Sequence, residues 1–188
     1  NCDSNEYGDR FDVMGSGSTR HLNAPHKEEA EWLNSDNIAV TTQGEYLLKA
    51  LERNLPRGSI QQIKLPLKMK PLYYSSANNV YYALEFRQPI DYDAGAPDKS
   101  YSGVFFHYSA GHSFPLFFTT NLINYNPSDL TPLLQVGETF RDSINEYAIT
   151  LRSITADGAM VKIERFQRTN QKPIGVFEGF RETFQKGR

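Results

Sequence analysis

The sequence predicts a mainly β protein: an antiparallel β-sandwich preceded by a tight turn and one short helix. After residue 36 apolar and polar side chains alternate with a period of two, which is the spacing of a half-buried strand. The alternating runs are short, and turn-forming residues such as Gly, Pro, Asn and Asp separate them. Short strands without helices between them are typical of antiparallel sandwiches, so this class of fold is expected.

The N-terminal part predicts a loop followed by the helix. Residues 1–22 are rich in Gly, Ser, Asn and Asp, which favour turns. Asn23 is placed to cap a helix over residues 24–33, and Pro25 is tolerated in the first turn of a helix. Leu22 precedes the cap, where an apolar residue packs against the first turn.

The rest of the chain predicts eight strands and a tail. The expected strands are residues 38–42, 45–51, 59–65, 80–87, 103–108, 116–120, 147–154 and 159–166. In the fourth strand the apolar face carries Val80, Tyr82, Leu84 and Phe86, and the other face carries Tyr81, Ala83, Glu85 and Arg87. The run Ala156-Asp157-Gly158 has the chemistry of a short hairpin turn between the last two strands. Residues 167–188 are mildly basic and contain breakers, so a solvated tail or an edge strand is expected there.

The composition excludes several classes of partner. Aromatic residues make up 13% of the chain, which is far more than a disordered chain carries. The formal net charge is −2 with both signs interspersed, so we expect no nucleic-acid partner. No apolar run approaches the roughly 20 residues that span a bilayer, so no membrane span is expected.

The most specific stretch of the sequence is Glu-Tyr-Gly-Asp-Arg-Phe-Asp-Val-Met-Gly at residues 6–15. Together with the following helix it resembles the Met-turn region of gametolysin-like zinc metallopeptidases and of the related immune-inhibitor-A peptidases. The matching residues are Tyr7, Gly8, Asp9, Phe11, Asp12, Val13, Met14, Gly15, Asn23, Ala24, Lys27, Trp32 and Leu33. Downstream, residues 82–87 and 136–140 look similar to the C-terminal portion of the same group.

This resemblance implies a secreted zinc-dependent endopeptidase that acts on a protein or peptide substrate. In the group, a helix with His-Glu-x-x-His-x-x-Gly-x-x-His supplies three zinc ligands and the general base. The zinc polarises the scissile carbonyl and activates a water molecule. A Met-turn then passes beneath the metal. The resemblance therefore implies that Tyr7, Asp12, Met14 and Gly15 form the structural floor of the site, with the Met14 side chain buried in a tight turn. In this chain alone, without the neighbours that the full-length protein supplies, partial exposure of Met14 is expected.

One departure from the group is decisive, because His-Glu-x-x-His occurs nowhere in the 188 residues. The histidines are His21, His26, His107 and His112. Zinc-binding histidines of a helix are four residues apart with a Glu beside the first, whereas each pair here is five apart. We therefore expect no catalytic residue and no metal ligand in this chain, and the isolated chain is predicted to be inactive.

The resemblance also implies a division of the chain. Residues 1–36 would be the C-terminal remnant of the catalytic domain, residues 37–166 the β-sandwich and residues 167–188 the tail. The ligands would then lie upstream in the same protein or on a companion chain. Cys2, the only cysteine, is either a free thiol or pairs with a cysteine upstream. Secretion favours the second interpretation.

Other candidate sites have competing interpretations. His21 and His26 are interpreted as capping and packing residues beside the helix start rather than as zinc ligands. Asp91, Tyr92 and Asp93, with Asp98 nearby, offer oxygen ligands that suit calcium. They lack the Gly and Glu spacing of a calcium loop, so a solvated turn is the favoured interpretation.

A second class of function competes with the peptidase. The chain would then be a non-enzymatic β-sandwich module that binds carbohydrate or a cell-surface protein. Its candidate stacking platforms are Tyr73, Tyr74, Tyr81 and Tyr101, because an exposed tyrosine ring offers both an apolar face and a hydroxyl group.

Overall fold

The computed structural model describes residues 11–14, 20–68, 80–94, 102–110, 120–121 and 133–166. These residues form a mainly β protein with two sheets and one short α-helix. The first sheet contains β1 (Ile38–Val40), β3 (Gln62–Pro66), β4 (Val80–Arg87), β5 (Gly103–Ala110), β6 (Thr120–Asn121) and β7 (Leu133–Leu134). The second contains β2 (Gly44–Leu48), β8 (Thr139–Asp142), β9 (Tyr147–Thr155) and β10 (Gly158–Arg165). The helices are α1 (Ala24–Glu29) and the 3-10 helices η1 (Ser35–Asn37) and η3 (Asp91–Asp93).

The first sheet, called sheet A from here on, is mixed rather than purely antiparallel. Its order is β1-β3-β4-β5-β6, and β7 pairs with β5 beside β6. Strands β3, β4 and β5 form antiparallel ladders, but β1 runs parallel to β3. The expectation of an antiparallel arrangement is therefore wrong for this pair. The chain leaves β1 to form β2 in the other sheet and returns to β3, and such a crossover permits a parallel neighbour.

The second sheet, sheet B, is antiparallel throughout, in the order β2-β10-β9-β8. Its central hairpin turns at Ala156 and Asp157, as the sequence predicted. Gly158 follows with a φ of +145°. A Cβ atom at Gly158 would lie 2.5 Å from the carbonyl oxygen of Leu48, so this position needs glycine for space as well as for its backbone conformation.

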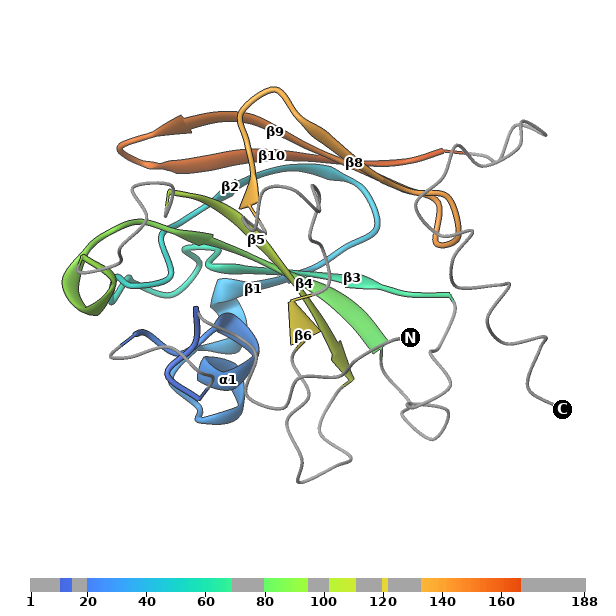
Figure 1. Cartoon of the computed structure of the whole chain (residues 1–188). Coiled ribbons are helices and arrows are strands. Elements are labelled where there is room, and N and C mark those ends of the chain that lie inside the picture. The colour runs from blue at the N-terminus through green and yellow to red at the C-terminus, as the bar shows by residue number, and fades with distance from the viewer. Residues whose placement is uncertain are drawn as a thin grey trace, which may run out of the picture.

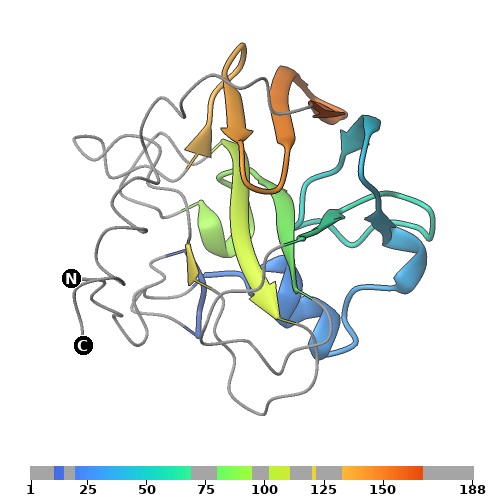
Figure 2. The same cartoon turned by 90° about the vertical axis from the view of Figure 1, so that its right-hand side faces the viewer.

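The elements form layers, with sheet B on one side of sheet A and helix α1 on the other (Figures 1 and 2). One buried apolar cluster draws side chains from both sheets, including Leu84 and Phe86 of β4 and Ile149 and Leu151 of β9. The apolar face predicted for the fourth strand therefore packs in this shared core. The opposite face of β4 is also buried, and it carries Glu85 and Arg87 toward the side of α1.

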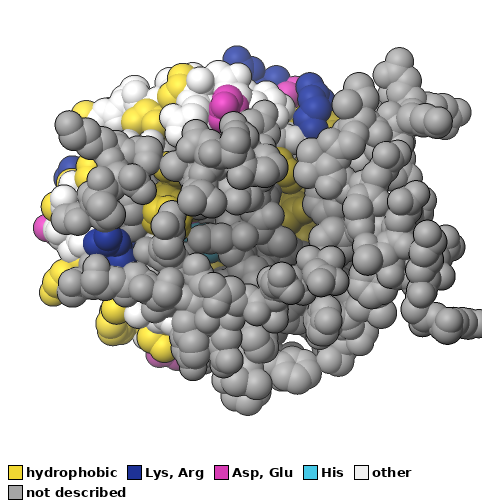
Figure 3. All heavy atoms as spheres, in the orientation of Figure 1, with side chains coloured by type: hydrophobic (Ala, Val, Ile, Leu, Met, Phe, Trp, Pro, Cys, Tyr) yellow, Lys and Arg dark blue, Asp and Glu magenta, His cyan; other side chains and the backbone are white. Residues whose placement is uncertain are grey.

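Charges of both signs lie on the outer side of sheet B. Figure 3 shows Lys and Arg side chains at the edge of the molecule that sheet B forms, with Asp or Glu side chains beside them. Two of these cations form ion pairs: Arg152 with Glu45 at 3.4 Å and Lys162 with Glu164 at 2.6 Å. Such exposed pairs contribute little to stability, but they leave no one-sign patch on the described part of this face.

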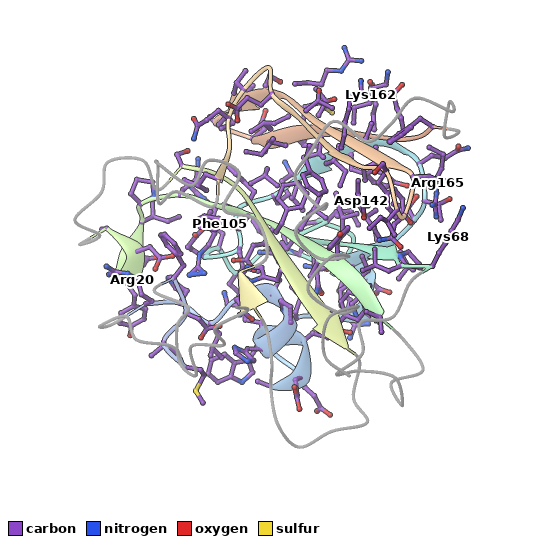
Figure 4. All side chains as sticks on the ribbon, turned by 45° about the vertical axis from the view of Figure 1, so that its right-hand side comes forward. Arg20, Lys68, Phe105, Asp142, Lys162 and Arg165 are labelled. Carbon is purple, nitrogen blue, oxygen red and sulfur yellow. The ribbon has the colours of Figure 1, made fainter. Side chains whose placement is uncertain are left out.

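Polar contacts join the two sheets at one end, where Lys68, Asp142 and Arg165 lie near one another (Figure 4). The hydroxyl group of Tyr82 in sheet A donates to Asp142 Oδ2 in sheet B at 2.9 Å. In return the hydroxyl of Tyr147 in sheet B donates to the carbonyl oxygen of Pro66 in sheet A at 2.8 Å. The guanidinium of Arg165 stacks 3.9 Å from the centre of the Tyr147 ring and holds it in place.

The predicted elements agree with the structure in part. The strand 80–87 and the Asn23 helix cap are confirmed, and the Asn23 side chain accepts the His26 N–H at 2.9 Å. The helix ends at Glu29 rather than at residue 33. Strands β7 and β8 were not predicted. Most of the predicted strand 116–120 and the whole tail 167–188 lie outside the described residues.

Candidate functional site

The candidate site is built around Asp12, which organises the turn formed by residues 11–14. The side chain of Asp12 is buried, and its Oδ1 accepts the N–H of Met14 at 2.7 Å. Its Oδ2 accepts the N–H of Asn23 at 2.9 Å and lies 2.5 Å from Nδ1 of His26. One carboxylate thus closes the 11–14 turn and fastens it to the first turn of helix α1.

Asp12 is held in its ionised form by these donors. Burial raises the pKa of Asp12, but the hydrogen bond and the positive charge of His26 lower it. The N–H groups of Met14 and Asn23 lower it further, and the net pKa lies below the ordinary value of 3.8. The negative charge therefore persists at neutral pH, and it is the charged form that holds the turn.

The outer side of the 11–14 turn is apolar and exposed. Phe11 and Asp12 anchor the inner side, whereas Val13 is 44% exposed and Met14 is 56% exposed. Met14 is therefore not buried in this chain, which agrees with the partial exposure expected in the absence of its neighbours. The physical reason is that Asp12 points inward to reach Asn23 and His26, which leaves the following residues on the outside. The other expected floor residues, Tyr7 and Gly15, lie outside the described residues.

Phe11 packs the inner side of the turn onto sheet A. Its ring lies 4.9 Å from that of Phe105 in β5, and the two rings form a small buried cluster with Leu133 of β7. Figure 4 shows Phe105 on the side of the molecule that also carries Arg20, away from the end where Lys68 and Arg165 lie. The turn is therefore attached to β5 by an apolar contact and to α1 by a charged one.

A buried arginine makes the remaining connection between the N-terminal segment and sheet A. Arg87 of β4 donates from Nη1 to the carbonyl oxygen of Phe11 at 2.7 Å and from Nη2 to that of His21 at 3.0 Å. Nε and Nη2 also donate to Asp93 Oδ2 at 3.2 and 3.0 Å, and Nη1 donates to Glu85 Oε1 at 3.2 Å. The Arg87 cluster is defined here as Arg87 with Glu52, Glu85, Asp93 and His107, all of which are buried.

Glu85 extends the Arg87 cluster to the start of helix α1. Its Oε2 accepts the N–H of Ala24 at 2.5 Å, while Nε2 of His107 lies 3.2 Å from its Oε1. Burial raises the pKa of Glu85, but His107, Arg87 and the Ala24 N–H together bring it below its ordinary value of 4.5. The charged carboxylate therefore joins β4, β5 and α1.

Asp93 is occupied by protein donors rather than left open for calcium. Its Oδ1 accepts the N–H of His21 at 3.2 Å, and its Oδ2 accepts both hydrogen bonds from Arg87. Tyr92 is exposed, and Asp98 lies outside the described residues. Among the residues that the structure describes, no three His, Cys, Asp or Glu side chains come together in a way that could hold a metal ion. The described residues thus do not fit a zinc site.

The described histidines all contact protein groups. His26 lies against Asp12 and His107 against Glu85. The ring of His21 meets Tyr92 edge-on at 5.3 Å, and burial together with the charge of Lys27 lowers its pKa below 6.5. These contacts agree with the packing interpretation of His21 and His26. His112 lies outside the described residues.

Sequence reasoning identified Asp12 and Met14 but missed the Arg87 cluster. One signal was present: the second face of the predicted strand 80–87 carries both Glu85 and Arg87, although the strand is flanked on both edges by others. Charged side chains on such a strand need buried partners. Glu52 and Asp93 lie in segments between strands, where sequence alone does not pair them with Arg87.

Comparison of the chain with protein-family models, with curated proteins and with solved structures found no match in any of the three. Within the described residues no helix has the length and apolar character needed to cross a membrane.

Proposed function

We propose that this chain is the C-terminal part of a secreted zinc-dependent endopeptidase of the gametolysin-like group, with residues 11–33 lying beneath the catalytic metal. The zinc ligands and the general base would come from an upstream portion of the same protein or from a companion chain. We also propose that sheets A and B form a β-sandwich that carries this segment.

The observation that carries the proposal is the Asp12-centred hydrogen-bond network. The resemblance rests on residues 5–33 and on two downstream runs, residues 82–87 and 136–140, that are distant in the sequence. Their matching residues contact one another: Asp12 binds Met14 and Asn23, and Ala24 binds Glu85. If the sequence resemblance were a coincidence, there would be no reason to expect the matching residues to contact one another. A turn that has to be held at one place beneath a metal does give such a reason.

The exposure of Val13 and Met14 also supports the proposal, because exposed apolar side chains suit a surface that another part of the protein covers. Both side chains belong to a turn whose inner side is held by buried groups, so the two exposed side chains have a fixed position on the surface. An unbranched thioether adapts to an uneven surface without bringing a competing hydrogen bond. The upstream catalytic portion is the partner that the resemblance implies for this surface.

The binding-module alternative receives no support from the described residues. Tyr81, one of its four candidate stacking platforms, is buried and accepts a hydrogen bond from Ser109 at 3.2 Å. Tyr73, Tyr74 and Tyr101 lie outside the described residues.

The test is to read the gene upstream of Asn1 and to express the longer polypeptide. The proposal expects a His-Glu-x-x-His helix there, one zinc per molecule and hydrolysis of an unfolded protein such as casein. Changing the Glu of that helix to Gln should abolish hydrolysis and retain the zinc, because this Glu is the base and not a ligand. An upstream sequence without such a helix would overturn the proposal.

The 188-residue chain provides the complementary test. It should hydrolyse no protein substrate and bind zinc no more tightly than micromolar. One stoichiometric zinc after dialysis, lost when His21 or His26 is changed to Ala, would contradict the proposed division between this chain and the missing ligands.

A further inference from the structure

Five hydrogen bonds of Arg87 go to groups other than Glu52, which forms only a longer ion pair with this guanidinium. A guanidinium group has five N–H donors. Those of Arg87 go to Asp93 twice, to Glu85, and to the carbonyl oxygens of Phe11 and His21. Glu52 Oε1 lies 3.5 Å from Nε of Arg87 and accepts the N–H of Gln88 at 3.0 Å, and the N–H of Glu52 itself also donates to this carboxyl group.

The second carboxyl oxygen of Glu52 has even fewer hydrogen-bond donors than the first. Glu52 is 7% exposed, and its Oε2 is buried with no hydrogen-bond partner among the described residues. Burial disfavours the ionised form of a carboxyl group, and more so when one of its two oxygens has no donor. Glu52 is therefore the member of the Arg87 cluster that is best suited to carry a proton.

We propose that Glu52 is a proton-operated latch on the candidate site: when protonated it lets Arg87 hold the 11–14 turn and helix α1 against sheet A, and when ionised it loosens that hold. The relevance to a peptidase rests on the proposed function, whereas the latch itself is a property of this chain.

The geometry links the charge of Glu52 to the N-terminal segment. An ionised Glu52 would attract the Arg87 guanidinium, whose Nε is already only 3.5 Å away. A shift of the guanidinium toward Glu52 lengthens its bonds to the carbonyl oxygens of Phe11 and His21. The first of these bonds holds the 11–14 turn against β4, and the second holds His21, which lies just before the cap of helix α1.

The pKa of Glu52 lies close enough to neutral pH for its protonation to change near neutral pH. Burial raises the pKa of Glu52 from 4.5 to about 8, although Arg87 and the N–H of Gln88 act in the opposite direction. The attached state thus binds the proton more tightly than an opened, solvated state does. Opening should become about tenfold more favourable for each unit of pH between 4.5 and 8, and level off above 8.

Other charged groups face the cluster and must be separated from Glu52. Glu85 and Asp12 have lowered pKa values, so they act below about pH 4.5 and 3.8. His21 and Lys27, whose pKa values are lowered by burial from 6.5 and 10.5, oppose the Glu52 effect because their loss of a proton favours the attached state.

The remaining facing groups are Asp93, His107 and His26. All of these groups are common to a wild-type chain and a Glu52→Gln variant, so the difference between the two reports the proton of Glu52 together with the effect of the Glu52 charge on the pKa of Lys27. Gln has nearly the same shape as protonated Glu, so this variant should fold with the latch permanently attached.

The experiment is hydrogen exchange of the 188-residue chain, with rates corrected for the intrinsic effect of pH. The reporter is the amide of Ala24, which is buried and donates to Glu85. Between pH 6.5 and 7.5 the protection factor of Ala24 should fall roughly tenfold in the wild type relative to Glu52→Gln. The matched control is Glu29→Gln, which changes an exposed carboxyl of the same helix and should behave as the wild type.

Three outcomes would overturn the latch. The first is an equal pH dependence in the wild type and in Glu52→Gln. The second is the same fall at Ile149 of β9, since the proton would then stabilise the whole fold. The third is a side-chain carboxyl resonance of Glu52 that titrates below pH 6. None of these depends on zinc, so an upstream sequence without a zinc helix would overturn the proposed function and leave this test intact.

Discussion

Nδ1 of His26 lies 2.5 Å from Oδ2 of Asp12, and this pair, 14 residues apart in the sequence, joins the 11–14 turn to helix α1. The carboxylate is almost fully buried, whereas the imidazole keeps a small exposed edge. The same oxygen accepts the N–H of Asn23, the residue that caps the helix. A single side chain therefore controls both where the turn sits and where helix α1 begins.

Replacing Asp12 by Ala should destabilise the chain strongly. The change leaves His26 and the N–H groups of Met14 and Asn23 without their acceptor in a buried place. The free energy of unfolding should fall by roughly 3–5 kcal/mol, as for other buried ion pairs that lose one partner. Asp36→Ala is the control, because Asp36 is exposed and its nearest cation, Arg57, is 3.7 Å away. Urea denaturation of both variants measures the difference, and equal costs would contradict the role of Asp12.

Acid should weaken the same contact. The pKa of Asp12 is lowered in the folded chain, so its contribution is fully present above the unfolded value of 3.8. That contribution is lost as the pH falls through the lower folded value. Asp12→Asn lacks this titration. The stability difference between the wild type and Asp12→Asn should therefore shrink between pH 5 and pH 2. A difference that stays constant over this range would show that Asp12 is not ionised in the folded state.

Removing the charge of Arg87 should affect the N-terminal segment most directly. Arg87→Met keeps an apolar stem but removes the guanidinium that contacts Asp93 and Glu85 and its donors to two carbonyl oxygens. We expect a loss of about 3–5 kcal/mol in the free energy of unfolding. Arg152→Met in sheet B is the control, because Arg152 is half exposed and should change stability by less than about 0.5 kcal/mol. Similar thermal midpoints for the two variants would disprove the role of Arg87.

Local patterns were enough to predict much of the β structure. The strand 80–87 alternates cleanly, and the Asp157-Gly158 turn fixes the hairpin of β9 and β10. Strand β7 has only two residues, so no alternation can be recognised in it. Strand β1 runs parallel to β3, and nothing in three residues encodes the direction of a neighbour. Pairing between strands depends on the whole chain rather than on any one window.

Only those contacts of the candidate site that join residues close together in the sequence could be predicted. Asp12, Met14 and Asn23 lie close together in the sequence, and the resemblance selected all three. The contacts of Arg87 with Phe11 and His21 span 76 and 66 positions. No composition or spacing rule connects residues so far apart. The extent of the exposure of Met14 could not be predicted from sequence, because it depends on which way the buried Asp12 turns the backbone.

The end of helix α1 offers a test of local conformation. Glu31 has a φ of +58°, and the N–H groups of Glu31 and Trp32 donate to the carbonyl oxygens of Glu28 and Lys27. This arrangement usually places Gly at the position of Glu31. Glu31→Gly should therefore stabilise the chain by about 0.5–1 kcal/mol, whereas Glu29→Gly inside the helix should destabilise it by about 1 kcal/mol. Thermal denaturation distinguishes them, and a loss of stability in Glu31→Gly would contradict this account of the helix end.

Met14 provides the sharpest test of the proposed function, because its importance should depend on what surrounds it. In the 188-residue chain Met14 is 56% exposed, so Met14→Ala should change the free energy of unfolding by less than about 0.5 kcal/mol. In the longer polypeptide with a zinc helix, the side chain would be covered by the catalytic portion. The same substitution should then cost about 2–5 kcal/mol, which is typical for truncating a buried Met. Zinc content should stay at one per molecule, because Met14 is not a ligand. An equally small cost in both polypeptides would mean that nothing covers Met14, and the principal reason for placing this turn beneath a metal would be lost.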